Sequence, residues 1–346
     1  MDKKKINTMK ELSEAIGVSR PTLSRYFQDP TSVRPSTSAK IEERLAEVDY
    51  VYNFLATRQN RKSTELIGVI VPYLQDLFFT SLLEAIERHA REFGFTIITQ
   101  SSDGDPRIEE HAVHKLRSMS ADGAIIAPLG NESSAELFRR ICDDMPIVFV
   151  DSHPVGDLDC ADFVGTDNSQ SVGSLVEYLC RAGDAPYFLG MPPLNTNALE
   201  RENAYAGSMR ALGHEPRFVD RRGADDSWQF EAYGHGVMDH HFSRQRYTNA
   251  TILCANDRIA IGAIRAANKH GLFTRGRDAP GILRIAGHDD HPLSRYMYPA
   301  VTTAAQDVGG IAKSAVELIV ERIRRERTGA PVRLLKGAAL KLRESA

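Results

Sequence analysis

The 346-residue chain has few of the residues and segments that mark secreted, membrane or metal-binding proteins. It contains four cysteines and one tryptophan, and no two cysteines form a CxxC pair or another zinc-like spacing. The cysteines are therefore expected to be reduced thiols of a cytoplasmic protein. The N-terminal stretch MDKKKINTMKELSE lacks the apolar core of a signal peptide, and no run approaches the roughly 18 apolar residues of a membrane-spanning helix. These absences predict a protein that is neither exported nor embedded in a membrane.

The sequence also lacks the common short motifs of enzymes. It contains no GxSxG, GxxxxGK[ST] or GxGxxG segment. Two histidine groups, His288-Asp289-Asp290-His291 and His235 with His240 and His241, offer metal-binding side chains, but neither has a recognised metal-site spacing. A solvated loop and a helix face explain them better. We therefore predict no catalytic residue, no metal and no cofactor.

Charge of either sign is modest overall but unevenly distributed. Hydrophobic residues make up 42% and charged residues 26% of the chain, which is ordinary for a globular protein with real cores. Residues 1–64 carry 12 Lys and Arg against 8 Asp and Glu, while the remaining residues carry 31 against 38. A basic N-terminal part on an acidic body suggests a polyanionic partner for that part, although the excess is small enough to arise by chance.

Residues 8–49 are expected to form three short helices. Gly17 ends the first helix, and Ser19 caps the second, which carries Pro21 in its first turn. The third helix is expected at roughly 36–48. The residues expected to face inward are Met9, Leu12, Ala15 and Ile16 in the first helix, Leu23, Tyr26 and Phe27 in the second, and Ile41, Leu45 and Val48 in the third.

Two helices joined by a glycine-containing turn, with a third packed across them, are typical of a helix-turn-helix. The second helix would then expose side chains of the kinds that read base edges and bind phosphate. A small helical hairpin with a solvated polar face is the alternative. The exposed residues expected on the second helix are Arg20, Thr22, Ser24, Arg25 and Gln28.

The pattern changes after a polar, basic linker at residues 53–64. The apolar run Leu66–Pro72 is typical of a strand buried on both faces of a parallel sheet. Strand and helix patterns then alternate to the end of the chain, which predicts two α/β lobes with doubly wound parallel sheets. The helices are expected at 80–93, 107–118, 133–142, 169–182, 200–212, 229–240, 257–270 and 308–327.

These patterns divide the chain into a small all-α helix-turn-helix head, a hinge and a two-lobed α/β domain. The boundaries expected are a head at 1–52, a hinge at 53–64 and a ligand-binding and dimerisation domain at 65–346. Within that domain, the N-lobe is expected to comprise about 65–165 plus 300–327, and the C-lobe about 166–299 plus 328–346.

The stretches MKELSEAIGVSRPTLSRYFQDP and VRPSTSAKIEERLAEVDYVYNFLATRQNRKSTELIGVIVP resemble the head and hinge of the LacI family of bacterial transcriptional regulators. The resemblance continues in order through nearly the whole chain. It implies a periplasmic-binding-protein-like fold that holds a small effector between its lobes. The further matching segments are Leu77-Phe78-Phe79, Ala121-Asp122-Gly123, Val150-Asp151, Arg201, Ala255-Asn256-Asp257, Gly287-His288-Asp289-Asp290, Thr302-Thr303 and Gln306-Asp307.

In the family, a hinge leucine enters the minor groove and kinks the DNA. Gln59 stands at the matching position here, so a leucine wedge is in doubt unless Leu55 or a shifted register replaces it. Arg58, Arg61 and Lys62 would follow the groove or the backbone, or else belong to a solvated linker. The expected DNA-binding residues are Ser19, Arg20, Pro21, Thr22, Ser24, Arg25, Gln28, Asn53, Arg58 and Arg61.

Three carboxylates follow expected strands, where α/β sheets bind ligands: Asp151, Asp257 and Asp289. Asp257 could instead cap the helix that it begins. The resemblance adds an arginine, Arg201, which is expected to open a helix and to clamp sugar hydroxyls. It also adds two aromatic residues beside the cleft, Phe78 and Phe79, and Gln306 at the crossover between lobes. Trp228 is a candidate stacking platform, and His288 replaces the usual aromatic residue.

The sequence therefore predicts a DNA-binding transcriptional regulator, of the repressor type, controlled by a small effector such as a sugar. It is expected to act as a homodimer on a palindromic operator. The alternatives are a sugar-modifying enzyme and a small-molecule-binding protein without a DNA role. The identity of the effector stays open, including a purine, as do activation in place of repression and a tetramer in place of a dimer.

Overall fold

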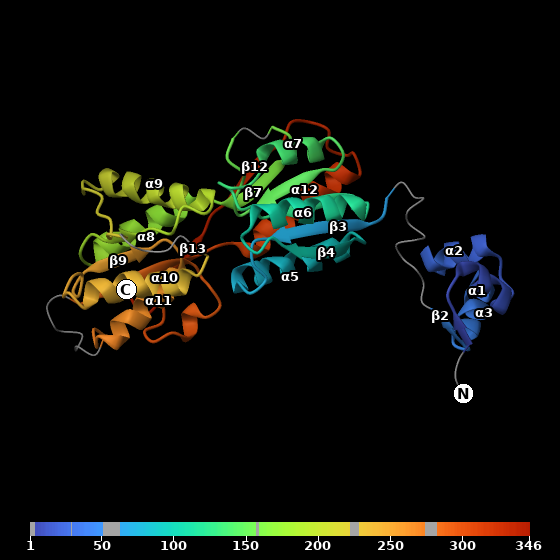
Figure 1. Ribbon diagram of the computed structural model, residues 1–346, viewed down its shortest axis with the longest axis horizontal. Helices are drawn as coiled ribbons and strands as arrows, with labels where there is room; N and C mark the ends of the chain where they lie inside the picture. The colour runs from blue at the N-terminus through green and yellow to red at the C-terminus, as the bar shows by residue number, and fades with distance from the viewer. Residues whose placement is uncertain (1–3, 29, 51–62, 157–158, 222–227, 274–281) are drawn as a thin grey trace. The chain divides into compact units, whose positions relative to one another are not determined.

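The computed structural model describes residues 4–28, 30–50, 63–156, 159–221, 228–273 and 282–346. The chain forms two compact units, Met1–Thr64 and Glu65–Ala346 (Figure 1). The expected hinge at 53–64 lies outside the described residues except for Ser63 and Thr64.

The described part of the N-terminal unit, residues 4–28 and 30–50, contains three helices around a small apolar core. They are α1 (Met9–Ile16), α2 (Arg20–Gln28) and α3 (Pro35–Leu45), with a short 3₁₀ turn at Pro30–Ser32. Thr8 caps α1 by accepting a hydrogen bond from Glu11 N, and Gly17 ends it with φ = 67°, a conformation that glycine adopts without strain. The buried core consists of Ile6, Leu12, Ile16, Leu23, Tyr26 and Ile41.

Two details of this unit differ from expectation. The third helix ends at Leu45, and Val48 instead belongs to a parallel strand pair, β1 (Lys4–Ile6) with β2 (Val48–Tyr50). Strands this short leave no periodic pattern in the sequence. Ala15 is exposed, because Leu12 and Ile16 already fill the inner face of α1.

The N-lobe of the second unit is a parallel sheet covered by helices on both faces. Its strand order is β12-β7-β6-β5-β3-β4. All residues of β3 are buried, as its continuous apolar run predicts. Helices α5 and α12 pack on one face, and α6 and α7 on the other. The bounds are β3 (Leu66–Val71), α5 (Leu77–Glu92), β4 (Thr96–Ser101), α6 (Pro106–Ser118), β5 (Gly123–Ile126), α7 (Ala135–Cys142), β6 (Ile147–Val150), β7 (Asp162–Thr166), α12 (Val308–Ile323) and β12 (Arg333–Lys336).

The C-lobe repeats this arrangement around a sheet of order β13-β11-β10-β9-β8, in which β13 alone runs antiparallel. Helices α8 and α9 pack together on one side of the sheet, and α10 and α11 on the other (Figure 1). The bounds are α8 (Asn168–Ala182), β8 (Tyr187–Leu189), α9 (Thr196–Ala211), α10 (Phe230–Phe242), β9 (Thr251–Cys254), α11 (Asp257–Lys269), β10 (Arg284–Asp289), β11 (Thr302–Ala305) and β13 (Ala339–Lys341). The predicted fold class, two doubly wound α/β lobes behind a small helical head, is confirmed.

Along the described strands, the chain crosses between the lobes after β7, after β11 and after β12. The expected lobe boundaries were therefore wrong in two places. Thr302–Ala305 pairs with β10 of the C-lobe, and Arg333–Lys336 pairs with β7 of the N-lobe. Short strands near a crossover can join either sheet, and only the pairing of residues distant in sequence decides which.

Across the part of the chain that the structure describes, no helix is long and apolar enough to cross a membrane.

Candidate functional site

Helix α2 presents a polar face on the surface of the N-terminal unit. Arg20, Pro21 and Arg25 are exposed, and Thr22 and Ser24 are half-buried. The helix begins as expected, because Ser19 Oγ lies 3.4 Å from Thr22 N and 2.8 Å from Thr22 Oγ1.

The other predicted DNA-binding residues lie outside the described structure. These are the side chain of Gln28 and the linker residues Asn53, Arg58 and Arg61. On the described residues, α2 offers hydroxyl groups and guanidinium groups side by side, which suits contacts to phosphates and base edges.

A narrow polar cavity lies between the two lobes of the second unit, at the carboxyl ends of the strands. Its volume is about 40 Å³. Strands β6, β9, β10 and β11 each direct a polar residue into it, as expected for α/β sheets. The residues that line it are Asp76, Phe78, Phe79, Asp151, Met191, Asn195, Asn197, Arg201, Trp228, Phe230, Asn256, Arg258, Asp289, His291 and Gln306. Seven of the eight predicted effector-binding residues are among them, and Asp257 is not.

Arg201 is the most buried charged side chain of this cavity, with 3% of its surface exposed. Its Nη2 lies 2.9 Å from Asp289 Oδ1, its Nε donates to Asn168 Oδ1 at 3.1 Å, and its Nη1 donates to the carbonyl of Ala255 at 2.8 Å. The helix does not begin at Arg201 as expected. Asn195 caps α9, which begins at Thr196, so Arg201 lies in the second turn. Its positive charge is therefore not placed at the positive end of the helix dipole, and its side chain points inward.

The Asp289 carboxylate accepts hydrogen bonds from three side chains. Besides Arg201, it accepts from His288 Nδ1 at 2.8 Å and from Gln306 Nε2 at 2.7 Å. Burial alone would raise the pKa of Asp289, but Arg201 and His288 together lower it below its ordinary value. Gln306 also accepts a hydrogen bond from Thr166, so this network reaches the crossover between the lobes.

His288 is held as a neutral ring beneath this carboxylate. Burial lowers the pKa of His288 to about 4, and the Arg201 charge acts in the same direction. With Nδ1 donating to Asp289, Nε2 is left to accept a hydrogen bond from Ser171 Oγ, 2.8 Å away. His288 therefore orients Asp289 and is not among the residues that line the cavity.

The pKa of Asp151 is raised, whereas that of Asp289 is lowered, because for Asp151 the effect of burial outweighs that of its favourable contacts. Burial raises the pKa of Asp151 to about 7, while the Arg201 charge acts in the opposite direction. Its backbone adopts φ = 62°, and its carbonyl accepts a hydrogen bond from Asn197 Nδ2 at 3.2 Å. A carboxyl group with this pKa exchanges its proton near neutral pH and can donate as well as accept a hydrogen bond.

The cavity also contains a charged group that the sequence did not single out. Arg258 Nη1 lies 2.9 Å from Asp76 Oδ2, and Asp76 caps α5 by accepting a hydrogen bond from Phe78 N. Burial raises the pKa of Asp76 despite the nearby Arg258 guanidinium. The position of Asp76 just before an amphipathic helix was a detectable cap signal, but the helix was expected to begin at 80.

Aromatic rings complete the walls. Phe78 and Phe79 are buried and meet edge to face with ring centroids 5.2 Å apart. Trp228 lies 5.7 Å from both Tyr73 and Phe230, measured between ring centroids. Such faces suit stacking against the apolar side of a ring-shaped ligand.

Asp257 lies beneath the cavity wall and is fully buried. It accepts hydrogen bonds from Ser294 Oγ at 2.6 Å and from His291 N at 2.9 Å. It does not cap α11 either, because Asn256 does so through Ile259 N. Burial raises the pKa of Asp257 to about 8. These contacts indicate that Asp257 supports the loop after β10.

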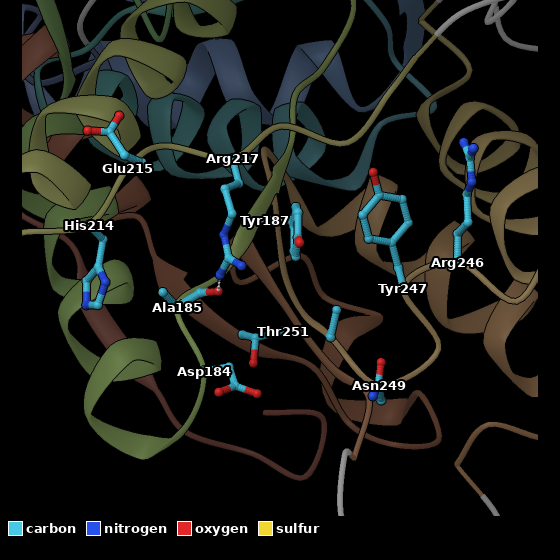
Figure 2. Close-up of a pocket in the computed structure, with 11 residues that line it drawn as sticks. Asp184, Ala185, Tyr187, His214, Glu215, Arg217, Arg246, Tyr247, Asn249 and Thr251 are labelled. Carbon is cyan, nitrogen blue, oxygen red and sulfur yellow. Dashed lines mark hydrogen bonds between the residues drawn. The ribbon is translucent and has the colours of Figure 1, made fainter.

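A second hollow, of about 870 Å³, opens at the surface of the C-lobe beside the amino ends of β8 and β9 (Figure 2). The Arg217 guanidinium lies over the Tyr187 ring at 4.2 Å and donates to the Ala185 carbonyl. Its charged residues balance, Arg217 and Arg246 against Asp184 and Glu215. This hollow lies at the amino ends of the strands, whereas the cleft lies at their carboxyl ends. Its described lining does not bring buried polar side chains together as the cleft does.

The histidines considered as metal ligands make other contacts. His241 Nε2 lies 2.8 Å from the Asp220 carbonyl, and His288 lies between Asp289 and Ser171. No group of three or more His, Cys, Asp or Glu side chains is arranged to hold a metal ion within the described ranges.

Comparison with known families agrees with this geometry. Residues 64–333 match a family model described as periplasmic binding proteins and sugar binding domain of the LacI family, and residues 3–52 match a helix-turn-helix model. The chain belongs to the LacI family. The resemblance predicted from the sequence is therefore confirmed.

Two curated relatives and one solved structure span nearly the whole chain. The regulator PtxS of Pseudomonas aeruginosa is 26% identical over 323 residues, which cover 92% of this chain and 90% of its own length. The ribose operon repressor of Escherichia coli K12 is 25% identical over 320 residues, covering 91% of this chain and 93% of its own length. A lac repressor dimer bound to operator and an anti-inducer has a TM-score of 0.80 at 22% identity, covering 99% of both chains.

Proposed function

We propose that this LacI-family protein is a sequence-specific DNA-binding transcriptional regulator, of the repressor type, whose operator affinity is set by a small effector bound between its lobes. One observation carries the proposal: a single chain joins a helix-turn-helix unit to a two-lobed unit whose cleft contains the buried Arg201–Asp289 pair. A protein that only bound or modified a sugar would have no use for the first unit. The relatives reported above carry the names of regulators and repressors, which supports the same conclusion.

Within this proposal, residues 1–52 form the DNA-binding head, 53–64 the hinge and 65–346 the effector-binding and dimerisation region. Ser19, Arg20, Pro21, Thr22, Ser24, Arg25 and Gln28 contact phosphates and bases from α2, and Asn53, Arg58 and Arg61 contact DNA from the hinge. Because one head presents one recognition helix, a homodimer would place two helices on a palindromic operator. The protein would act in the cytoplasm, where the DNA is.

We assign the effector to the uncharged polyhydroxylated compounds, and a monosaccharide fits best. Asp289 and Arg201 offer acceptors and donors to hydroxyl groups, and Phe78, Phe79 and Trp228 offer aromatic faces. Three carboxylates line the cavity, at Asp76, Asp151 and Asp289, against two guanidinium groups. Both guanidinium groups already pair with carboxylates, Arg201 with Asp289 and Arg258 with Asp76, so neither is left to neutralise a phosphate or carboxylate on the ligand.

Fluorescence anisotropy tests the proposal, with labelled DNA from the chain's own upstream region and from genome-selected fragments, at fixed salt concentration. We expect binding that resists competitor DNA and that one sugar of a panel alters. Phosphorylated sugars and nucleobases in the same panel test the charge argument. Absence of specific binding to any fragment would refute the regulator and favour the alternatives, a sugar-modifying enzyme or a small-molecule-binding protein without a DNA role.

A further inference from the structure

An ion bridge joins the two lobes across one end of the cleft. Arg258 belongs to α11 of the C-lobe, and its Nη1 lies 2.9 Å from Oδ2 of Asp76, the residue that caps α5 of the N-lobe. The side chains of Arg258 and Asp76 are only 17% and 9% exposed. Solvent therefore screens this pair less than it screens a surface salt bridge.

The C-lobe fixes the direction of the Arg258 guanidinium before it reaches across. Glu231 of α10 accepts hydrogen bonds from Arg258 Nε and Nη2, both at 2.7 Å, in the bidentate geometry that suits arginine. The Phe230 ring lies 5.2 Å from the same guanidinium. Nη1 is left to point at the opposite lobe.

Close packing of α10 against α11 keeps Glu231 and Arg258 together. A Cβ atom on Gly262 would lie 2.1 Å from the Glu231 carbonyl oxygen, and one on Gly234 would lie 2.3 Å from the Ile259 carbonyl oxygen. Only glycine allows the two helices to approach so closely. The pair is thus mounted on a rigid platform, and movement between Arg258 and Asp76 requires movement of the lobes.

An aromatic contact lies beside the bridge. Tyr73 follows β3 of the N-lobe, Trp228 precedes α10 of the C-lobe, and their ring centroids are 5.7 Å apart. The lobes also meet near the start of α9, where Glu200 Oε1 lies 3.2 Å from Arg333 Nη2 and 3.3 Å from His153 Nε2. The Arg333 and Glu200 side chains are 48% and 33% exposed, so solvent screens that pair more than it screens Arg258–Asp76. The buried ion pair and the indole contact therefore lie together at one end of the cavity.

The cavity is small for a sugar. Its volume of about 40 Å³ compares with a few hundred Å³ in typical ligand pockets. Asp76, Arg258 and Trp228 all line it. A ligand of monosaccharide size must therefore separate these groups in order to enter.

We propose that Asp76, Arg258 and Glu231, together with the Tyr73–Trp228 contact, form an interlobe latch that holds the cleft shut and that an entering effector must break. The latch does not depend on the DNA-binding role, whereas its release by an effector rests on the proposed function. Opening would change the angle between the lobes, which is the quantity that regulators of this design can transmit to DNA.

The single tryptophan makes the latch directly measurable in the full-length protein. Asp76→Asn keeps an oxygen that can cap α5 but removes the negative charge that holds Arg258. We expect acrylamide to quench Trp228 about twofold more effectively in this variant, since the cleft would open more often. The radius of gyration from small-angle X-ray scattering should rise as well.

Asp144→Asn is the matched control. Asp144 also lies in the N-lobe and pairs with an arginine, since its Oδ2 lies 2.5 Å from Arg117 Nη2, but it precedes β6 at the end of the sheet away from the cleft. This variant removes the same charge without touching the latch, so quenching and radius should match those of the wild type. Arg258→Gln provides a second variant that should open the cleft if Asp76→Asn fails to fold by circular dichroism.

Wild-type quenching and wild-type radius in both bridge variants would overturn the latch. Equal opening in Asp144→Asn would overturn it too, because the effect would then follow from charge alone. Operator binding is measured separately on the same samples. A protein that opens as expected but binds no DNA would keep the latch and refute the proposed function.

Discussion

Arg201 and Asp289 form an ion pair 2.9 Å long in the interior of the C-lobe, between the second turn of α9 and the end of β10. The arginine makes two further hydrogen bonds, to Asn168 and to the Ala255 carbonyl, so its position is fixed before any ligand arrives. Asp289 is likewise held, by His288 and Gln306. Such pre-organisation reduces the cost of ordering side chains on binding.

Arg201→Lys tests this arrangement. Lysine keeps a positive charge beside Asp289 but cannot reproduce the planar set of donors that serves Asn168 and Ala255. We expect the fold to persist and the affinity for the sugar that alters operator binding to fall about 10-fold or more, corresponding to about 1.4 kcal/mol. Isothermal titration calorimetry measures the affinity, and thermal unfolding by circular dichroism checks the fold.

Arg201→Met, which removes the positive charge as well as the donors, is the second variant to compare with the wild type. Removing the cation would leave the Asp289 carboxylate buried without its partner, a loss of about 3–5 kcal/mol in typical buried pairs. We therefore expect a large fall in thermal stability for methionine and a smaller one for lysine, which keeps the charge but leaves the Asn168 and Ala255 oxygens without their donor. Unchanged effector affinity in the lysine variant would contradict a direct role for Arg201 in binding.

The head allows a prediction about DNA. Arg20 and Arg25 are exposed on α2, so their replacement by alanine should not disturb the core. We expect each variant to lose about 10-fold or more in operator affinity, as for loss of one base or phosphate contact. Arg44→Ala is the matched control, because Arg44 is an exposed arginine of α3 whose Nη1 lies 3.4 Å from Glu47 Oε2. Equal losses in all three variants, measured by anisotropy at one salt concentration, would show general electrostatics instead of recognition by α2.

The cleft positions of residues near strand ends could be predicted from the sequence. A buried apolar run predicts a strand, and the carboxyl end of a strand in a parallel sheet predicts the edge where ligands bind. Asp151, Asp289 and Gln306 were found in this way or through the family resemblance, and all three line the cavity. Asp257 shows the limit of that argument. It too follows a strand, yet its side chain turns under the wall toward Ser294.

What the sequence could not supply depends on contacts between distant segments. Asp76 and Arg258 are 182 positions apart, and neither belongs to a motif that announces the other. The strand β11 joins the C-lobe through pairing with β10, which no local pattern reveals. The pair β1–β2 is three residues long on each side, too short for any periodicity to appear.

Gly17 should be required for the geometry between α1 and α2. Its φ of 67° lies in the left-handed region, where a side chain costs about 1 kcal/mol. We expect Gly17→Ala to speed hydrogen–deuterium exchange in the head by about fivefold, the ratio that corresponds to such a loss. Mass spectrometry of peptides from 4–50 measures it in the full chain.

Gly94→Ala is the control for this substitution. Gly94 has φ = 82° and open space around its Cα, but it follows α5 in the second unit. Its replacement should affect exchange near residues 90–96 and leave the head and operator binding unchanged. An unaltered head in Gly17→Ala would show that another residue sets the turn.

Asp257 gives the pH dependence of the second unit. Burial raises the pKa of Asp257 to about 8 from an unfolded value of 3.8, so the folded state holds this proton more tightly than the unfolded state. Between about pH 4 and 8, the unfolded chain has lost the proton and the folded protein has kept it. The contribution of Asp257 to the free energy of unfolding therefore falls as pH rises through this interval.

Asp257→Asn removes the titration while keeping an oxygen to accept from Ser294 and His291 N. We expect the free energy of unfolding of the variant, relative to wild type, to rise by about 3–4 kcal/mol between pH 5 and pH 8, since each pH unit of this interval contributes about 1.36 kcal/mol until the folded carboxyl itself begins to ionise. Urea unfolding followed by the fluorescence of Trp228 reports on this unit alone, because the head contains no tryptophan. Parallel stability curves for the two proteins would show that Asp257 ionises at an ordinary pH, and that its burial among Ser294 and His291 is compensated by the polar groups around it.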